Sequence, residues 1–240
     1  MKLTQDLSQI QFGIGFGENH FTMDRGSFDY EESFIYQRML VFSRVETEPF
    51  IPAASEKAAD KQILVFSDPD LPIEYLLSLE KGPETEVLKY EGARGKEGSE
   101  IPVRPLLPNR FRISFPSDNE EHFYGCGETY SEWDLKGQRV RIYTAEHQNS
   151  RRIAEKTERE MREGKNPEFR LPFDQYESYY VQPTAVSSEK YFIHCDTVKY
   201  MQFDFTEPGR TALLFQEDPR IILGEADSFP ALSEKLKRLL

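Results

Sequence analysis

The sequence predicts an all-β protein, and three observations support that expectation. Short runs of alternating polar and apolar residues recur along most of the chain, which is the period-2 pattern of half-buried strands. The chain contains 18 Phe and 12 Tyr, and aromatic residues are enriched in strands. Its length of 240 residues suits one large all-β domain, which can bury a substantial core.

The first third of the chain carries clear strand patterns. Residues 9–16 alternate polar residues or glycine with apolar residues, and residues 20–24 continue the pattern after a turn at 17–19, so we expect a hairpin. Residues 91–108 combine glycines, charges and prolines, which predicts a long loop between two halves of one sheet system. Further strands are predicted at residues 34–42, 62–66 and 74–79.

The most informative segment covers residues 123–148. A strand at residues 122–126 runs into Gly125 and Gly127, which allow a sharp turn and a close approach to other groups. Glu128 follows at once, and we expect its carboxylate to accept backbone N–H groups and to fix that turn.

A second strand follows a turn at residues 134–137 and covers residues 140–144. It ends in three consecutive polar residues, Glu146, His147 and Gln148. A strand that ends in such side chains presents hydrogen-bonding groups to a ligand, and a hydroxyl-rich ligand suits them.

One segment departs from the strand pattern. Residues 150–163 are rich in helix-forming residues and contain acid–base pairs four residues apart, such as Glu155 and Arg159, so we expect an inserted surface helix that ends at Gly164. Strands are then predicted at residues 178–181, 191–195, 200–205, 210–215 and 220–223.

The last thirteen residues predict a C-terminal helix. Ser228 is a good N-cap, and the proline two residues later suits a first helical turn. One face of the helix is apolar and consists of Phe229, Leu232, Leu236 and Leu239. We expect this face to be uncovered and to mark a boundary with a further domain.

Several ordered motifs resemble glycoside hydrolase family 31. The stretch Tyr-Gly-Cys-Gly-Glu at residues 124–128 resembles the Tyr-Gly-x-Gly-Glu signature of the N-terminal domain of that family. Its continuation to Gly137 is similar to the sulfoquinovosidase-type α-glycosidase branch. The similarity resumes at residues 179–184, 188–192 and 200–205.

The resemblance implies a fold and a function. The fold is a galactose-mutarotase-like, two-sheet antiparallel β-sandwich with one inserted helix and a C-terminal linker helix. Residues 1–227 are expected to form this domain, and residues 228–240 to lead to a catalytic (β/α)8 barrel that the chain lacks. In the family the two catalytic aspartates lie in the barrel. We therefore expect a non-catalytic domain of a retaining α-glycoside hydrolase, and we assign no catalytic residue.

The resemblance also implies site residues. At the position of Glu146 the family carries an acidic residue, more often Asp, on a loop at the rim of the active-site pocket, where it binds sugar hydroxyls. His147 and Gln148 are further candidates for substrate binding. We expect Trp133 and Tyr130 to pack in the core or against another domain rather than on a sugar.

The composition of the chain limits the classes of molecule that we expect it to bind. The net charge of −12 argues against nucleic acid and anionic membranes, which attract clustered cations. The histidines form no metal-binding pattern, so we expect neither a metal nor a cofactor. Cys126 and Cys195 are expected to be buried, reduced thiols in the cytoplasm, because no signal peptide is recognisable at the start. The expected partners are an α-glycoside substrate and the protein's own barrel.

Two other functions stay open. A free-standing carbohydrate-binding module needs an exposed aromatic platform. A small enzyme of the mutarotase type needs a histidine and a carboxylate that converge in one groove.

Overall fold

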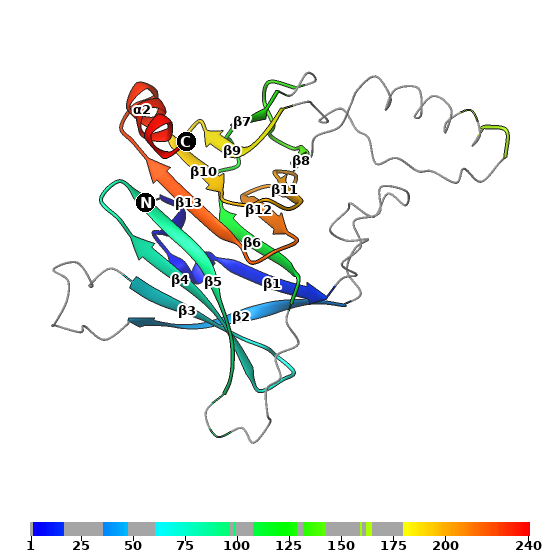
Figure 1. Cartoon of the computed structure of the whole chain (residues 1–240), viewed down its shortest axis with the longest axis vertical. Helices are drawn as coiled ribbons and strands as arrows, with labels where there is room; N and C mark the ends of the chain where they lie inside the picture. Colours follow the sequence, from blue (N-terminus) through cyan, green and yellow to red (C-terminus); the bar gives the residue numbers. More distant parts are fainter. Residues whose placement is uncertain are drawn as a thin grey trace.

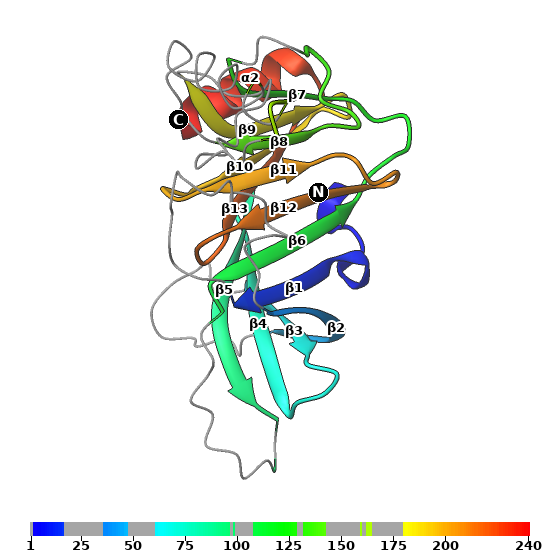
Figure 2. The ribbon, with the colours of Figure 1, turned by 90° about the vertical axis from the view of Figure 1, so that its right-hand side faces the viewer.

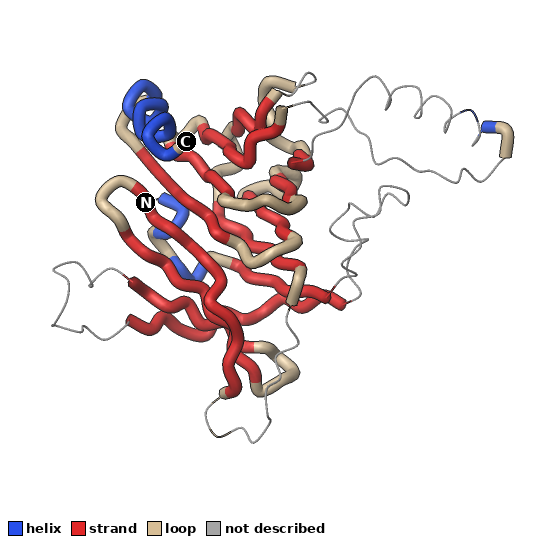
Figure 3. The backbone as a smooth tube through the Cα atoms, in the orientation of Figure 1, coloured by secondary structure: helices blue, strands red, loops and turns tan. Residues whose placement is uncertain are grey.

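The computed structural model describes residues 2–16, 36–47, 61–96, 98, 108–128, 132–142, 159, 162–164 and 180–240. Strands make up most of the described chain (Figures 1 and 3). The strands are β1 (Gln11–Phe16), β2 (Tyr36–Thr47), β3 (Lys61–Ser67), β4 (Ile73–Lys81), β5 (Thr85–Gly95), β6 (Arg110–Pro116), β7 (Phe123–Gly127), β8 (Arg139–Ile142), β9 (Val181–Ser187), β10 (Tyr191–Cys195), β11 (Met201–Asp204), β12 (Arg210–Phe215) and β13 (Arg220–Glu225). The helical elements are the 3-10 helices η1 (Lys2–Thr4) and η2 (Leu7–Gln9) and the α-helix α2 (Phe229–Leu239).

The described strands follow one continuous hydrogen-bonded order rather than the two separate sheets expected. That order is β7-β9-β10-β13-β5-β4-β3-β2-β1-β6-β12-β11-β8, and neighbouring strands are antiparallel. The strand β2 joins the two halves, because residues 36–40 pair with β1 and residues 41–47 pair with β3. A register shift between Phe42 and Arg44 adds a bulge, and bulges bend a strand.

The sheet curls until its two ends come close together (Figure 2). At one end β7 pairs with β9, and β8, from the other end, also contacts β9. One core cluster contains fully buried aromatic residues from both halves of the sheet: Phe12, Phe66, Phe111, Phe115, Phe203 and Phe215. The rings of Phe12 and Phe66, from different halves, meet edge to face with centroids 5.3 Å apart. The strands therefore share one hydrophobic core.

The N-terminal segment packs against the same core. Leu3 and Ile10 are fully buried in it, and the Thr4 hydroxyl donates a hydrogen bond to the carboxylate of Glu86 on β5. Glu86 is itself buried, so this bond satisfies a polar group that would otherwise be costly to bury.

Most strand predictions in the described residues are confirmed, but the loop prediction for residues 91–108 is wrong at its start. The strand β5 continues to Gly95, and β6, which we did not predict, begins at Arg110. Lys89 of β5 is partly exposed and pairs with Glu80 at 2.8 Å, while Leu88 is fully buried. The predicted strand at residues 178–181 instead begins at Val181 as β9, and the one predicted at residues 20–24 lies outside the described residues.

Only the end of the predicted inserted helix falls within the described residues. The N–H of Glu163 donates to the Arg159 carbonyl at 3.0 Å, as in an α-helix, and Gly164 has a φ of 68°, as in a left-handed cap. Among the residues that the structure describes, no helix is long and apolar enough to cross a membrane.

The prediction that the apolar face of the C-terminal helix is uncovered is wrong. Ser228 caps α2 as predicted, because its hydroxyl accepts the N–H of Ala231. Leu232 is buried against Phe192 of β10 and Ile222 of β13, and Leu236 and Leu239 pack on the same cluster. Of the four predicted face residues, Phe229 is the exposed one. The outer side of the sheet is apolar at this place, so the helix covers a surface of its own domain.

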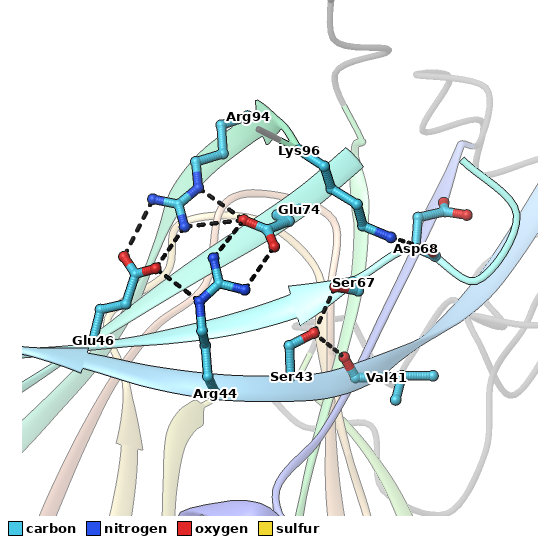
Figure 4. A network of polar contacts seen from close by, with 9 residues as sticks. All are labelled: Val41, Ser43, Arg44, Glu46, Ser67, Asp68, Glu74, Arg94 and Lys96. Atoms are coloured by element: carbon cyan, nitrogen blue, oxygen red, sulfur yellow. Dashed lines mark hydrogen bonds and ion pairs between the residues drawn. The ribbon is translucent and has the colours of Figure 1, made fainter. Parts of the chain in front are cut away.

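A network of ion pairs covers the outer side of β2, β4 and β5 (Figure 4). Glu74, whose side chain is 7% exposed, bridges Arg44 and Arg94, with 2.9 Å between the nearest charged atoms of each pair. Glu46 pairs with the same two arginines at 3.0 and 2.7 Å. The two carboxylates and two guanidinium groups balance each other in charge, so the negative charge of the nearly buried Glu74 has direct partners.

Candidate functional site

The glycine pair in β7 lets two strands approach closely. Gly125 and Gly127 have φ angles of 110° and 98°, and Cys126 between them has a φ of 64°. A Cβ atom on Gly127 would lie 2.4 Å from the carbonyl oxygen of Tyr180, so another residue would clash there. The segment is a bulge against β9. The close approach that the two glycines predict is confirmed.

Glu128 holds this bulge by its backbone. Its N–H donates to the Tyr180 carbonyl at 3.0 Å, and its side chain is exposed. The contact between the Glu128 carboxylate and backbone N–H groups stays a prediction; the described bond at this turn is the one that the Glu128 N–H donates.

The turn between β7 and β8 is anchored by Asp134. Its Oδ2 lies 2.5 Å from Nδ1 of His122, and its Oδ1 accepts the N–H of Lys136 at 3.1 Å. Partial burial raises the pKa of the Asp134 carboxyl, but the hydrogen bonds from His122 and from backbone N–H groups such as that of Lys136 together outweigh burial, so the net pKa is lowered. Leu135 is fully buried, and its N–H donates a hydrogen bond to the carbonyl oxygen of Phe123 at 2.8 Å. The predicted turn at residues 134–137 is confirmed.

Trp133 is 85% exposed, so the part of our prediction that placed it in the core is wrong. Its ring lies 6.1 Å from that of Tyr124, and the two planes are tilted by 47°. The neighbouring Leu135 anchors the turn in the core and leaves Trp133 outside. Tyr130 lies outside the described residues.

The strand β8 leads to the predicted site residues and ends at a cavity. Ile142, its last residue, lines a cavity of about 1140 Å³ that Val181 at the start of β9 also lines. Glu146, His147 and Gln148 lie outside the described residues, so their role stays a prediction.

The cavity is lined by polar groups at strand ends and in turns. The polar groups include Asn109, Arg110, Lys199, Gln216, Glu217 and Asp218, and apolar residues such as Ile142 and Val181 line the cavity beside them. They come from segments far apart in the sequence, and no local motif marks any of them. Amide, carboxylate and guanidinium groups together suit a ligand with many hydroxyl groups.

The two carboxylates of the cavity differ in their roles. Glu217 holds the loop between β10 and β11, because its Oε1 accepts the N–H groups of Val198 and Lys199 at 2.9 and 3.1 Å. Burial raises the pKa of the Asp218 carboxyl, and the attraction of Lys199 opposes this effect only in part, so the net pKa is raised. A retaining glycosidase needs two carboxyl groups about 5–5.5 Å apart, one of them free to attack as a nucleophile. Since Glu217 is bound to the backbone, we assign no catalytic pair here.

The described histidines and cysteines form no further site. His122 is bonded to Asp134, and Nδ1 of His194 lies 2.8 Å from the hydroxyl of Thr184. Cys126 and Cys195 are free and fully buried, and burial raises the pKa of both thiols, as expected for inert cysteines. Within the described ranges no three His, Cys, Asp or Glu side chains are grouped so that they could hold a metal ion.

The sequence of this chain is similar to a known protein family and to characterised relatives. Residues 40–158 match the family described as the glycosyl hydrolase 31 N-terminal galactose mutarotase-like domain. A sulfoquinovosidase of Escherichia coli strain K12 is 30% identical over 190 residues, which are 77% of this chain and 27% of that protein. A sulfoquinovosidase of Agrobacterium fabrum is 28% identical over 81% of this chain and 24% of that protein. The chain thus spans about a quarter of the length of these relatives.

A solved structure has the same fold. A GH31 family sulfoquinovosidase from E. rectale, in complex with the aza-sugar inhibitor IFGSQ, superposes with a TM-score of 0.67. The match has 23% sequence identity and covers 95% of this chain and 30% of the other.

Proposed function

Because this chain belongs to the glycosyl hydrolase 31 N-terminal galactose mutarotase-like domains, we propose that it serves a retaining α-glycosidase of the sulfoquinovosidase type. In this proposal the chain is a non-catalytic domain of that α-glycosidase. Residues 1–227 form the domain, and residues 228–240 lead to a catalytic (β/α)8 barrel. The two halves of the curled sheet then correspond to the two layers of a β-sandwich.

One observation carries the proposal. The strand β8, which follows the Gly-Cys-Gly-Glu motif, ends at Ile142 on the wall of the polar cavity, four residues before Glu146. The last described residue of this strand therefore lies on the cavity wall, and the predicted substrate-binding residues follow it closely in the sequence. In the proposed protein Glu146, His147 and Gln148 bind the hydroxyl groups of an α-glycoside from one side of the pocket.

The substrate class and the compartment are part of the same proposal. The two relatives are named sulfoquinovosidases, which favours a sulfonated α-glycoside over an ordinary α-glucoside. The buried free thiols of Cys126 and Cys195 fit a reducing compartment such as the cytoplasm.

The two alternatives receive unequal support. The exposed Trp133 beside Tyr124 is the kind of surface that a carbohydrate-binding module uses. A mutarotase-type enzyme is less favoured, because no described histidine lines the cavity that holds Glu217 and Asp218.

The test compares the 240-residue chain with the whole protein in which it occurs, using p-nitrophenyl α-sulfoquinovoside and p-nitrophenyl α-glucoside. We expect the whole protein to hydrolyse the sulfonated substrate with retention of the anomeric configuration, and the chain alone to show no turnover above buffer. Turnover that copurifies with the 240-residue chain would refute the non-catalytic role. Failure of the whole protein on both substrates would refute the glycosidase assignment.

A further inference from the structure

One wall of the cavity is built by two loops that are bonded to each other. Residues 196–200 connect β10 to β11, and residues 216–219 connect β12 to β13. Both loops line the cavity, and we call them the loop pair. Two backbone hydrogen bonds, of 3.0 and 3.3 Å, join the loop pair at its ends: the Asp196 N–H donates to the Arg220 carbonyl, and the Gln216 N–H donates to the Tyr200 carbonyl.

The side chain of Glu217 holds the middle of the loop pair. Its Oε1 accepts hydrogen bonds from the hydroxyl of Thr197 and from the N–H groups of Val198 and Lys199, the latter two at 2.9 and 3.1 Å. A carboxylate binds such donors about twice as strongly as a neutral acceptor does. Val198 is 95% exposed, so burial of its side chain does not hold the loop. The conformation of residues 197–199 therefore depends on Glu217.

The loop pair presents two exposed side chains to the cavity. Val198 and Lys199 are both exposed, and both line the cavity. An isopropyl group can pack on the C–H face of a sugar ring, and an ammonium group donates hydrogen bonds to sugar oxygens. Because the loop is ordered when the domain folds, a ligand that contacts it does not bear the entropy cost of ordering it.

We propose that Glu217 is a positioning residue for substrate binding, which holds Val198 and Lys199 against an α-glycoside in the cavity. The inference rests on the proposed function, in which this cavity is one side of the substrate pocket. In this role Glu217 acts through the loop rather than on the reacting atoms.

The test compares Glu217→Ala with Glu217→Gln in the whole protein, with p-nitrophenyl α-sulfoquinovoside as the substrate. Alanine removes the acceptor, so the loop must be ordered on each binding event. We expect KM to rise by roughly 5–20-fold, with kcat changed by less than about twofold. Glutamine keeps an oxygen that accepts the same N–H groups, so KM should return to within about threefold of the wild-type value. Thr197→Val removes one of the three bonds and should raise KM by about two- to fivefold.

A measurement of the loop and a control variant accompany the kinetics. In hydrogen exchange, a peptide that covers residues 197–199 should exchange at least about ten times faster in Glu217→Ala, and near the wild-type rate in Glu217→Gln. The matched control is Asp6→Ala. The Asp6 carboxylate also accepts a hydroxyl and an N–H group, both from Ser8, but Asp6 is not among the residues that line the cavity. Its loss should leave KM unchanged.

The other outcomes overturn the inference. A wild-type KM in Glu217→Ala, even with faster exchange, would give the loop a structural role only. Equal rises in KM for alanine and glutamine would show that Glu217 acts by its charge, and a large fall in kcat would place it at the reacting atoms. The proposed function fails when the whole protein hydrolyses neither p-nitrophenyl α-sulfoquinovoside nor p-nitrophenyl α-glucoside. The inference fails alone when an active enzyme has a KM that is insensitive to Glu217.

Discussion

Nδ1 of His122 lies 2.5 Å from Oδ2 of Asp134, and this contact ties the start of β7 to the turn that carries Trp133. Both side chains are about two-fifths exposed, so solvent screens the pair. We expect a coupling of about 0.2–1 kcal/mol from a double-mutant cycle with His122→Gln and Asp134→Asn, measured by urea unfolding of the 240-residue chain. The fluorescence of Trp133 should also change in each variant, because the turn loses an anchor. Strictly additive single effects would show that the contact contributes nothing.

The glycine bulge gives a prediction with a matched control. Gly127→Ala should destabilise the chain strongly, because it adds a Cβ atom 2.4 Å from the Tyr180 carbonyl at a φ of 98°. Gly137→Ala meets open space at a φ of 76° and should cost only the backbone strain, about 1 kcal/mol. The loss at Gly127 should exceed that at Gly137 by roughly 1–3 kcal/mol in urea unfolding. Equal losses would contradict the close approach of β7 to β9.

The ion pairs around Glu74 predict acid sensitivity. Hydrogen bonds from Arg44, then from Arg94, hold the pKa of the Glu74 carboxyl below its ordinary value. A carboxyl with a lowered pKa stabilises the fold above its unfolded pKa of about 4.3, and that stability is lost as the pH falls through the lower folded value. We therefore expect Glu74→Gln to reduce the free energy of unfolding by about 1–3 kcal/mol at pH 7 and by progressively less as the pH falls below about 4.3.

The control for that pH series is Glu234→Gln. Glu234 pairs with Lys237 on the exposed side of α2, and its loss should leave the unfolding midpoint unchanged at every pH. If the two variants respond alike to acid, the network of Figure 4 does not govern acid stability.

The sequence predicts those structural features that depend on the residue itself or on its near neighbours in the chain. The positive φ angles of Gly125 and Gly127 follow from the residue type, and the cap at Ser228 follows from a hydroxyl next to the first helical turn. Residues 210–215 and 220–223 are predicted as strands and form β12 and β13, in which consecutive residues on both faces are buried. The strand β5 was not predicted; its Lys89 pairs with Glu80 of the neighbouring β4.

What the sequence could not predict depends on distant contacts. The amphipathic pattern of α2 indicates an apolar face, but only the fold places Phe192 and Ile222 beneath Leu232. Trp133 is exposed and Leu135, two residues later, is fully buried. Both are large apolar residues in the same turn, so no local pattern indicates which of them is buried. Of the cavity groups, Asn109 precedes β6, whereas Gln216 and Asp218 lie in the turn between β12 and β13, and these two segments meet only through the pairing of the strands.

The proposed substrate contact gives the last prediction. In the whole protein, Glu146→Ala should lower kcat/KM on the sulfonated α-glycoside by roughly ten- to a hundred-fold, because a carboxylate that accepts a sugar hydroxyl contributes a charge-assisted hydrogen bond of ~1.5–3 kcal/mol. His147→Ala and Gln148→Ala should have smaller effects, since neutral hydrogen bonds contribute less. The domain should keep its Tm in all three variants. Glu234→Ala removes a carboxylate from the exposed side of α2 and should leave kcat/KM unchanged. Wild-type kcat/KM in Glu146→Ala would remove the residue from the substrate site, and an equal loss in Glu234→Ala would trace the effect to net charge.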